Sequence, residues 1–205
     1  MDDIVIRLKK EYPDSQCSLY YQSPFQLLVA TILSAQCTDE RVNKVTRELF
    51  RKYPSAKDFS ELPLETIKKE IYSTGFYNNK AKSIKRMAKI IVEEHGSKLP
   101  ENIEKMIKLP GVGRKTANVV LGNVYNIPSV VVDTHVTRIT NMLNFVNTKD
   151  AVKIERKLMK IINQNDWTIF AHLLIDHGRA ICVANRPQCG ECVISEFCPS
   201  NKGDN

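Results

Sequence analysis

The stretch Leu109-Pro110-Gly111-Val112-Gly113-Arg114-Lys115-Thr116 combines two glycines in a tight turn with a lysine at the start of a helix. Gly111 and Gly113 can adopt a positive φ at little cost, so successive backbone N–H groups can converge on one anion beside the positive end of that helix. A phosphate fits such a site, and Lys115 adds a nucleophilic amine next to it. The alternative interpretation is an ordinary turn between two helices.

Helical periodicity and helix caps recur along the chain, whereas β-branched alternation is confined to about 127–132. The sequence therefore predicts an all-α fold. Ser23-Pro24 and Thr38-Asp39 are typical helix starts, and Gly96 is a typical helix stop. The helices expected from these signals span 24–33, 39–53, 79–95, 100–107, 114–125, 136–143, 150–162 and 166–181. The turn at about 108–114 joins the helices at 100–107 and 114–125 into a helix-hairpin-helix.

The chain has 205 residues and a formal net charge of +7, with 23 acidic residues interspersed among 30 basic ones. This balance indicates a folded basic protein whose partner is a polyanion such as nucleic acid. No apolar stretch is long enough to span a membrane, and the N-terminal Met1-Asp2-Asp3-Ile4 is acidic where a secretory signal is basic. We therefore expect a cytoplasmic protein that does not bind membranes.

Four of the six cysteines crowd one short segment with the spacing Cys-x6-Cys-x2-Cys-x5-Cys, formed by Cys182, Cys189, Cys192 and Cys198. Four soft ligands so close together indicate a metal centre rather than reduced structural cysteines. Zinc more often takes two Cys-x-x-Cys pairs, whereas an iron–sulfur cluster accepts uneven spacing, so the spacing favours iron modestly over zinc. Cys17 and Cys37 stand alone in apolar surroundings, where we expect small buried side chains.

The hairpin stretch, Val132-Asp133-Thr134-His135 and the four-cysteine loop together resemble the endonuclease III family, as do Leu33-Ser34-Ala35-Gln36 and Tyr77-Asn78. The resemblance covers essentially the whole chain. It implies a DNA glycosylase with a coupled strand-cleaving lyase activity that removes oxidised pyrimidines and works as a monomer on damaged double-stranded DNA. It also implies a 4Fe-4S cluster held by the loop 182–198. The expected fold has two helical lobes flanking a DNA-binding cleft: a six-helix lobe at 18–128, and a cluster lobe made of 1–17 and 129–205.

Lys115 and Asp133 are the catalytic residues that the resemblance implies. Lys115 attacks the anomeric carbon of an extruded nucleotide, expels the base and forms a Schiff base whose rearrangement eliminates the 3′ phosphate. The amine must be neutral to attack, which Arg114, the helix dipole and partial desolvation favour. Asp133 accepts the lysine proton and stabilises positive charge on the sugar. An N-cap on the following helix is the alternative role of Asp133.

The resemblance also implies DNA contacts outside these two residues. Gln36 would fill the space left by the flipped base, and the alternative is a buried structural glutamine. Phe76 stands where many relatives have a leucine wedge, and the alternative is core packing. The remaining expected DNA contacts are Gly111, Gly113, Arg114, Thr116, His135 and Arg186. His135 is alternatively a helix-start residue, and Arg186 is the one basic residue between the first two cysteines of the loop.

A basic run follows Phe76 and comprises Lys80, Lys82, Lys85, Arg86 and Lys89. It can add phosphate contacts through counterion release, although a solvated helix face is the default interpretation. Two other functions compete with the bifunctional enzyme. A monofunctional adenine mismatch glycosylase lacks a lysine at the position of Lys115 and carries an extra domain. A non-catalytic DNA-binding or redox module leaves Lys115 and Asp133 without a role.

Overall fold

The computed structural model describes residues 1–201, and all regular secondary structure in that range is helical, which confirms the expected all-α fold. The α-helices are α1 (Asp2–Glu11), α2 (Pro24–Leu33), α3 (Asp39–Lys52), α4 (Ala56–Glu61), α5 (Leu64–Ile71), α6 (Tyr77–His95), α7 (Ile103–Met106), α8 (Arg114–Val124), α9 (Thr134–Met142), α10 (Ala151–Ile161) and α11 (Trp167–Ala180). Short 3-10 helices are η1 (Tyr72–Thr74), η2 (Gln164–Asp166), η3 (Cys189–Glu191) and η4 (Ser195–Phe197).

Local capping explains where most helices begin. The Ser23 side chain accepts a hydrogen bond from the backbone of Gln26 at the start of α2, and Thr38 does the same for Arg41 at the start of α3. Both starts were predicted from the sequence. The expected helix at 100–107 is wrong in its first turn: α7 begins only after Asn102, whose side chain accepts from the backbone of Lys105.

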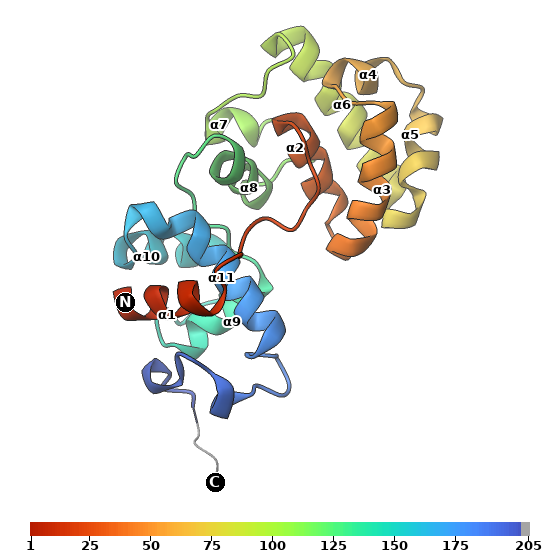
Figure 1. The fold of residues 1–205 in the computed structure, drawn as a ribbon. Helices are drawn as coiled ribbons and strands as arrows, with labels where there is room; N and C mark the ends of the chain where they lie inside the picture. Colours follow the sequence, from red (N-terminus) through yellow and green to blue (C-terminus); the bar gives the residue numbers. More distant parts are fainter. Residues whose placement is uncertain (202–205) are drawn as a thin grey trace. The chain divides into compact units, whose positions relative to one another are not determined.

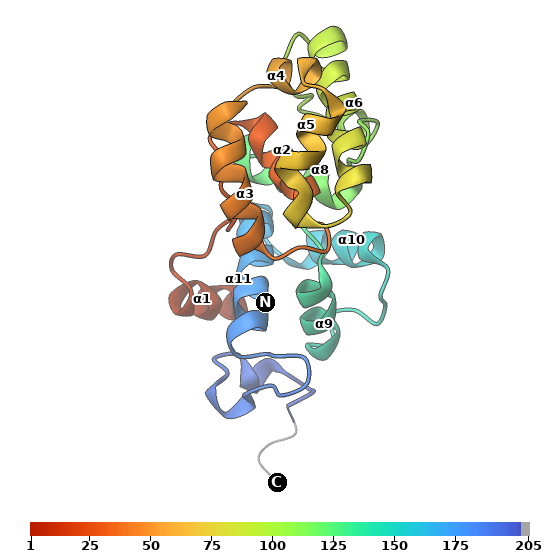
Figure 2. The same ribbon diagram turned by 90° about the vertical axis from the view of Figure 1, so that its right-hand side faces the viewer.

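The chain divides into two compact units, and the first of them, Ser18–Asn126, contains α2 to α8. Its central element is α2, where every residue after Pro24 is buried because the helix is apolar on all sides. Helices α3, α6 and α8 pack on α2, while α4 and α5 pack on α6 (Figures 1 and 2). This packing presents the loop after α2 and the start of α8 on a rigid helical scaffold.

The second unit joins Met1–Cys17 to the chain from Ile127 onward, and it contains α1, α9, α10 and α11. Helix α11 packs against both α9 and α1 (Figure 1). The Arg7 guanidinium ties α1 to the cysteine-rich segment, because it pairs with the Glu196 carboxylate and stacks 5.0 Å from the Phe197 ring centroid. The N-terminal helix thus supports the segment that contains the four clustered cysteines.

The β-branched run at 127–132 does not form a strand in the described part of the chain. Val130, Val131 and Val132 are nevertheless buried. Ser129 bonds to the Thr168 side chain through both its backbone N–H and its carbonyl, at 3.5 and 3.4 Å. These two hydrogen bonds fix the start of the buried run to α11. None of the helices within residues 1–201 is both long and apolar enough to cross a lipid bilayer.

Candidate functional site

The hairpin at 109–113 is held by its apolar residues, with Leu109 and Val112 buried. Gly111 has φ +79°, and a Cβ there would lie 2.7 Å from the Cβ of Ser83 on α6. Both the conformation and the space therefore require glycine at this position. Gly113 differs from the expectation of a positive φ: its φ is −90°, and a Cβ would meet no atom within 4 Å. Gly113 instead leaves open space at the N-terminus of α8.

Helix α8 begins directly after Gly113, with no side chain capping its first turn. Backbone N–H groups at a helix start and the positive end of the helix dipole can bind an anion at this point. Arg114 and Lys115 are exposed in this first turn, and Thr116 is half-buried. The sequence analysis expected partial desolvation of Lys115. Because Lys115 is exposed, the surrounding protein does not provide this desolvation. Any such desolvation has to come from a bound ligand.

Asp133 caps helix α9: its Oδ1 accepts a hydrogen bond from the backbone N–H of Val136 at 2.8 Å. The capping role considered for Asp133 is therefore confirmed. The side chain is half-buried, and only Oδ1 is used in the cap. A carboxylate that is oriented through one oxygen can still accept a proton or face a positive charge through the other.

His135 lies in the first turn of α9, and its ring packs inside its own unit. Its Nδ1 is 3.4 Å from Nη2 of Arg138, and a Cβ on Gly178 of α11 would approach this Nδ1 to 2.6 Å. The ring thus fills the space that Gly178 leaves between α9 and α11. This packing agrees with the helix-start interpretation of His135, and its DNA contact stays a prediction.

Arg138 is a residue of this region that the sequence did not single out. Its Nη2 donates to the carbonyls of Gly178 and Cys182, which links α9 to the first clustered cysteine. Its Nε is buried without a hydrogen-bond partner. A single arginine on an amphipathic helix carries no sequence signal for this role, because its acceptors lie about forty residues further along the chain.

Gln36 and Phe76 both lie on exposed turns of the first unit. Gln36 is exposed with φ +54°, and Phe76 is 63% exposed with φ +49°. The alternatives of a buried structural glutamine and of a core phenylalanine are therefore wrong. Non-glycine residues seldom adopt a positive φ, and such outliers tend to collect at functional sites.

The basic run after Phe76 is not a single face. Lys80 is 6% exposed, and the half-buried Lys85 donates to the carbonyl of Leu62, so both ammonium groups are hydrogen-bonded within the protein. The exposed members are Lys82, Arg86 and Lys89, and their spacing places them on one side of α6. These three side chains can face a phosphate backbone.

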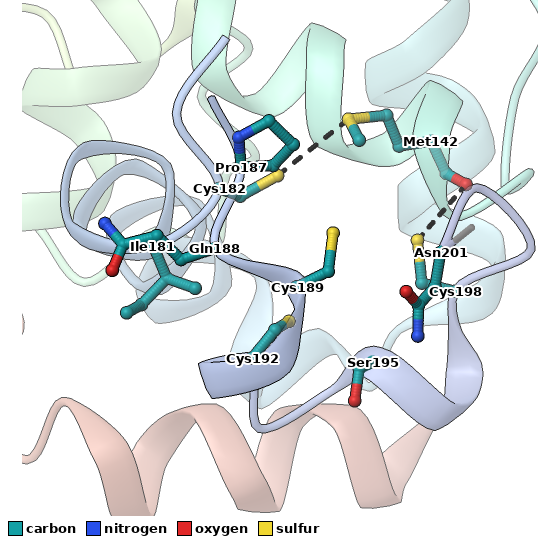
Figure 3. A pocket seen from close by; sticks show the side chains of 10 residues that line it. All are labelled: Met142, Ile181, Cys182, Pro187, Gln188, Cys189, Cys192, Ser195, Cys198 and Asn201. Atoms are coloured by element: carbon teal, nitrogen blue, oxygen red, sulfur yellow. Dashed lines mark hydrogen bonds between the residues drawn. The ribbon is translucent and has the colours of Figure 1, made fainter. Parts of the chain in front are cut away.

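The four clustered cysteines line one pocket together with Met142 of α9 (Figure 3). Cys182 Sγ lies 3.8 Å from Met142 Sδ, and Cys198 Sγ lies 3.6 Å from the Met142 carbonyl. Burial raises the pKa of the Cys182 and Cys192 thiols. Cys17 and Cys37 lie elsewhere and are half-exposed, so the expectation that both are buried is wrong. Arg186 is exposed in the loop between Cys182 and Cys189.

The donor set of this pocket fits a metal centre that is held by thiolates. Four free thiols line it, and no carboxylate does. Within residues 1–201, no three His, Cys, Asp or Glu side chains converge closely enough to hold one metal ion. Four thiolates are a ligand set found both for a structural zinc ion and for an iron–sulfur cluster.

The structure therefore gathers the predicted residues in two groups, one in each unit. The first unit carries Gln36, Phe76, Gly111, Gly113, Arg114, Lys115 and Thr116. The second unit carries Asp133, His135, Arg186 and the four clustered cysteines.

Comparisons with known proteins agree with these features. The family model described as HhH-GPD superfamily base excision DNA repair protein matches residues 29–164. An endonuclease III from Synechocystis sp. is 52% identical over 199 residues, which cover 97% of this chain and 91% of the relative.

Two solved structures share the fold and 41% of the sequence. One is described as a non-covalent endonuclease III–DNA complex, with a TM-score of 0.92 over 97% of this chain and 94% of that one. The other is described as a trapped endonuclease III–DNA covalent intermediate in an estranged-adenine complex, with a TM-score of 0.91 over 97% and 93% of the two chains.

Proposed function

This chain belongs to the HhH-GPD superfamily of base excision DNA repair proteins, and from that membership we propose that it is a bifunctional DNA glycosylase and abasic-site lyase. The observation that carries the proposal is Lys115, an exposed amine in the uncapped first turn of α8, directly after a glycine hairpin that can bind a phosphate. A monofunctional glycosylase needs no amine nucleophile at this position, and a docking module would use Lys115 only as a cation for phosphate.

In this mechanism the neutral Lys115 amine attacks the anomeric carbon of an extruded nucleotide, and the bond from that carbon to the base breaks. The base leaves with the electron pair of that bond and takes up a proton. The sugar ring opens to a Schiff base, which activates the neighbouring carbon for loss of a proton. The bond to the 3′ phosphate then breaks, and the strand is cleaved.

Asp133 accepts the proton that Lys115 gives up and stabilises positive charge on the sugar. Bound DNA removes water from Lys115, which supplies the desolvation that the protein alone does not provide. Gln36 hydrogen-bonds the base left without its partner, and Phe76 fills the gap in the stack. The hairpin and the exposed cations of α6 bind the phosphates. Oxidised pyrimidines are the lesions we propose, and the cytoplasm is where we place the reaction.

The function is tested by incubating the protein with duplex DNA that carries thymine glycol or an abasic site, with and without borohydride. The expected results are base release from the first substrate, strand cleavage of both, and a covalent protein–DNA adduct only after reduction. Base release without cleavage or adduct would identify a monofunctional glycosylase. Tight binding without either reaction would leave a docking module.

We also propose that Cys182, Cys189, Cys192 and Cys198 hold a 4Fe-4S cluster. When bound, the cluster supplies a structural crosslink for the loop, because four thiolates from one short segment then share one rigid group. No step of the base-excision chemistry depends on it.

The expected composition of the purified protein is about four iron and four acid-labile sulfide atoms per chain. Cys189→Ser is expected to lower the iron content strongly, while Cys17→Ser, which lies outside the pocket, keeps it. Iron and sulfide analysis, with zinc measured in parallel, checks this. Stoichiometric zinc without sulfide would contradict the cluster.

A further inference from the structure

Lys80 is a buried cation that neither the mechanism nor the family comparison uses. It is the fourth residue of α6, and it is 6% exposed. Its Nζ donates to the Leu33 carbonyl and to the Thr74 carbonyl, each at 2.8 Å. Among the described residues no carboxylate lies within ion-pair distance of this ammonium. Burial lowers the pKa of Lys80, and the Cys37 thiol opposes that shift. Burying an amine in this way is costly unless its hydrogen bonds are strong.

The dipole of α6 does not stabilise the buried charge of Lys80. A cation near the N-terminus of a helix is disfavoured by the helix dipole, and Lys80 lies close to that end of α6. The two carbonyls that accept from Lys80 indicate what its burial achieves. Leu33 is the last residue of α2 and Thr74 is the last residue of η1, so both carbonyls belong to helix ends. One ammonium therefore ties together the ends of two helices that are distant in sequence.

Each of these helix ends leads directly into one of the exposed turns. Gln36, at φ +54°, follows Leu33 by three residues, and Phe76, at φ +49°, follows Thr74 and Gly75. The other non-glycine residues with positive φ in the described chain are Ser97, Asn126 and Asn144. Asparagine tolerates this conformation well, whereas glutamine and phenylalanine rarely adopt it. Both turns next to Lys80 thus carry a backbone conformation that is uncommon for their residue type.

We propose that Lys80 is a positioning residue that holds the Gln36 turn and the Phe76 turn as one rigid element for entry into duplex DNA. The inference rests on the proposed function, in which these two side chains occupy the space around an extruded nucleotide. Extrusion costs unstacking and unpairing free energy, and side chains that must reach one gap together do so at lower entropic cost when they are fixed beforehand. The ammonium meets this need because it bonds to backbone and leaves both side chains free.

Lys80→Met tests the proposal, because methionine fills similar space but donates no hydrogen bond. The readout is the single-turnover rate of the borohydride-trapped adduct on an abasic duplex and on an abasic single strand, which has no opposite base to displace. We expect a loss of roughly tenfold or more on the duplex and less than about twofold on the single strand. In a Gln36→Ala Phe76→Ala background, Lys80→Met is expected to add less than about twofold, since no side chain is left to position.

Met87→Ala is the matched control, because Met87 is fully buried on the same helix and is outside both turns. It lowers stability and is expected to leave the ratio of duplex to single-strand rates unchanged. Equal losses of Lys80→Met on both substrates, no loss on either, or a full additional loss in the double-alanine background would overturn the role of Lys80.

If Lys80→Met does not fold, Lys80→Arg gives the same test. Arginine keeps donors and charge, but its larger planar group cannot place one nitrogen between both carbonyls. An unchanged ratio in a folded Lys80→Arg would overturn the proposal. A wild-type protein that forms no adduct on either substrate would instead refute the proposed function itself, so the two failures are distinguishable.

Discussion

Lys115→Gln is expected to abolish the borohydride-trapped adduct and to lower both base release and strand cleavage by about 10³-fold or more. Glutamine keeps a polar, unbranched side chain that is one atom shorter, and it removes the nucleophilic amine. Lys115 is exposed in the first turn of α8, so the replacement is expected to change the free energy of unfolding by less than about 0.5 kcal/mol. Single-turnover assays on thymine glycol and abasic duplexes, together with thermal unfolding, measure these effects.

The control for Lys115→Gln is Lys105→Gln, which removes an exposed lysine from the neighbouring α7. It is expected to keep the adduct and the turnover rate. DNA affinity is measured for both variants, because the loss of one cation weakens phosphate binding only modestly compared with the loss of the nucleophile. An adduct that persists in Lys115→Gln would show that another amine forms the Schiff base.

The parts of the site that the sequence predicted correctly depend on neighbours a few residues away. The cap that Asp133 provides for Val136 spans three residues, and the hairpin glycines precede α8 directly. Such interactions can be predicted from local sequence, because the donor and the acceptor lie within one turn of helix of each other. The shared pocket of the four cysteines follows from the same proximity.

The features that the sequence missed depend on partners that are distant along the chain. Lys80 appears in the sequence as one member of a basic run, but its acceptor Leu33 comes from a different helix. A lysine next to the buried face of α6 can be solvated or buried, and only packing decides between these. Gly113 shows a different limit: glycine permits a positive φ without requiring it, and here the φ is −90°.

Asp133→Asn separates the two roles of Asp133, since asparagine keeps a side-chain oxygen that can accept from Val136 N–H at the present 2.8 Å. We expect the free energy of unfolding to change by only a few tenths of a kcal/mol, while base release falls by about 10²- to 10⁴-fold. The neutral amide can neither take the proton of Lys115 nor oppose positive charge on the sugar. Asp133→Ala removes the cap as well, and is expected to lose about 1 kcal/mol of stability in addition.

The comparison of these two variants decides which role limits activity. If Asp133 acts only as a cap, base release follows stability: Asp133→Asn keeps near-normal rates, and Asp133→Ala loses them in proportion to its destabilisation. If the carboxylate takes part in the chemistry, both variants lose base release to a similar extent although only Asp133→Ala is destabilised. Thermal unfolding and single-turnover base release on the same preparations distinguish these outcomes. Near-normal rates in Asp133→Asn would therefore refute the catalytic role, because the geometry of the cap is the one property that this variant retains.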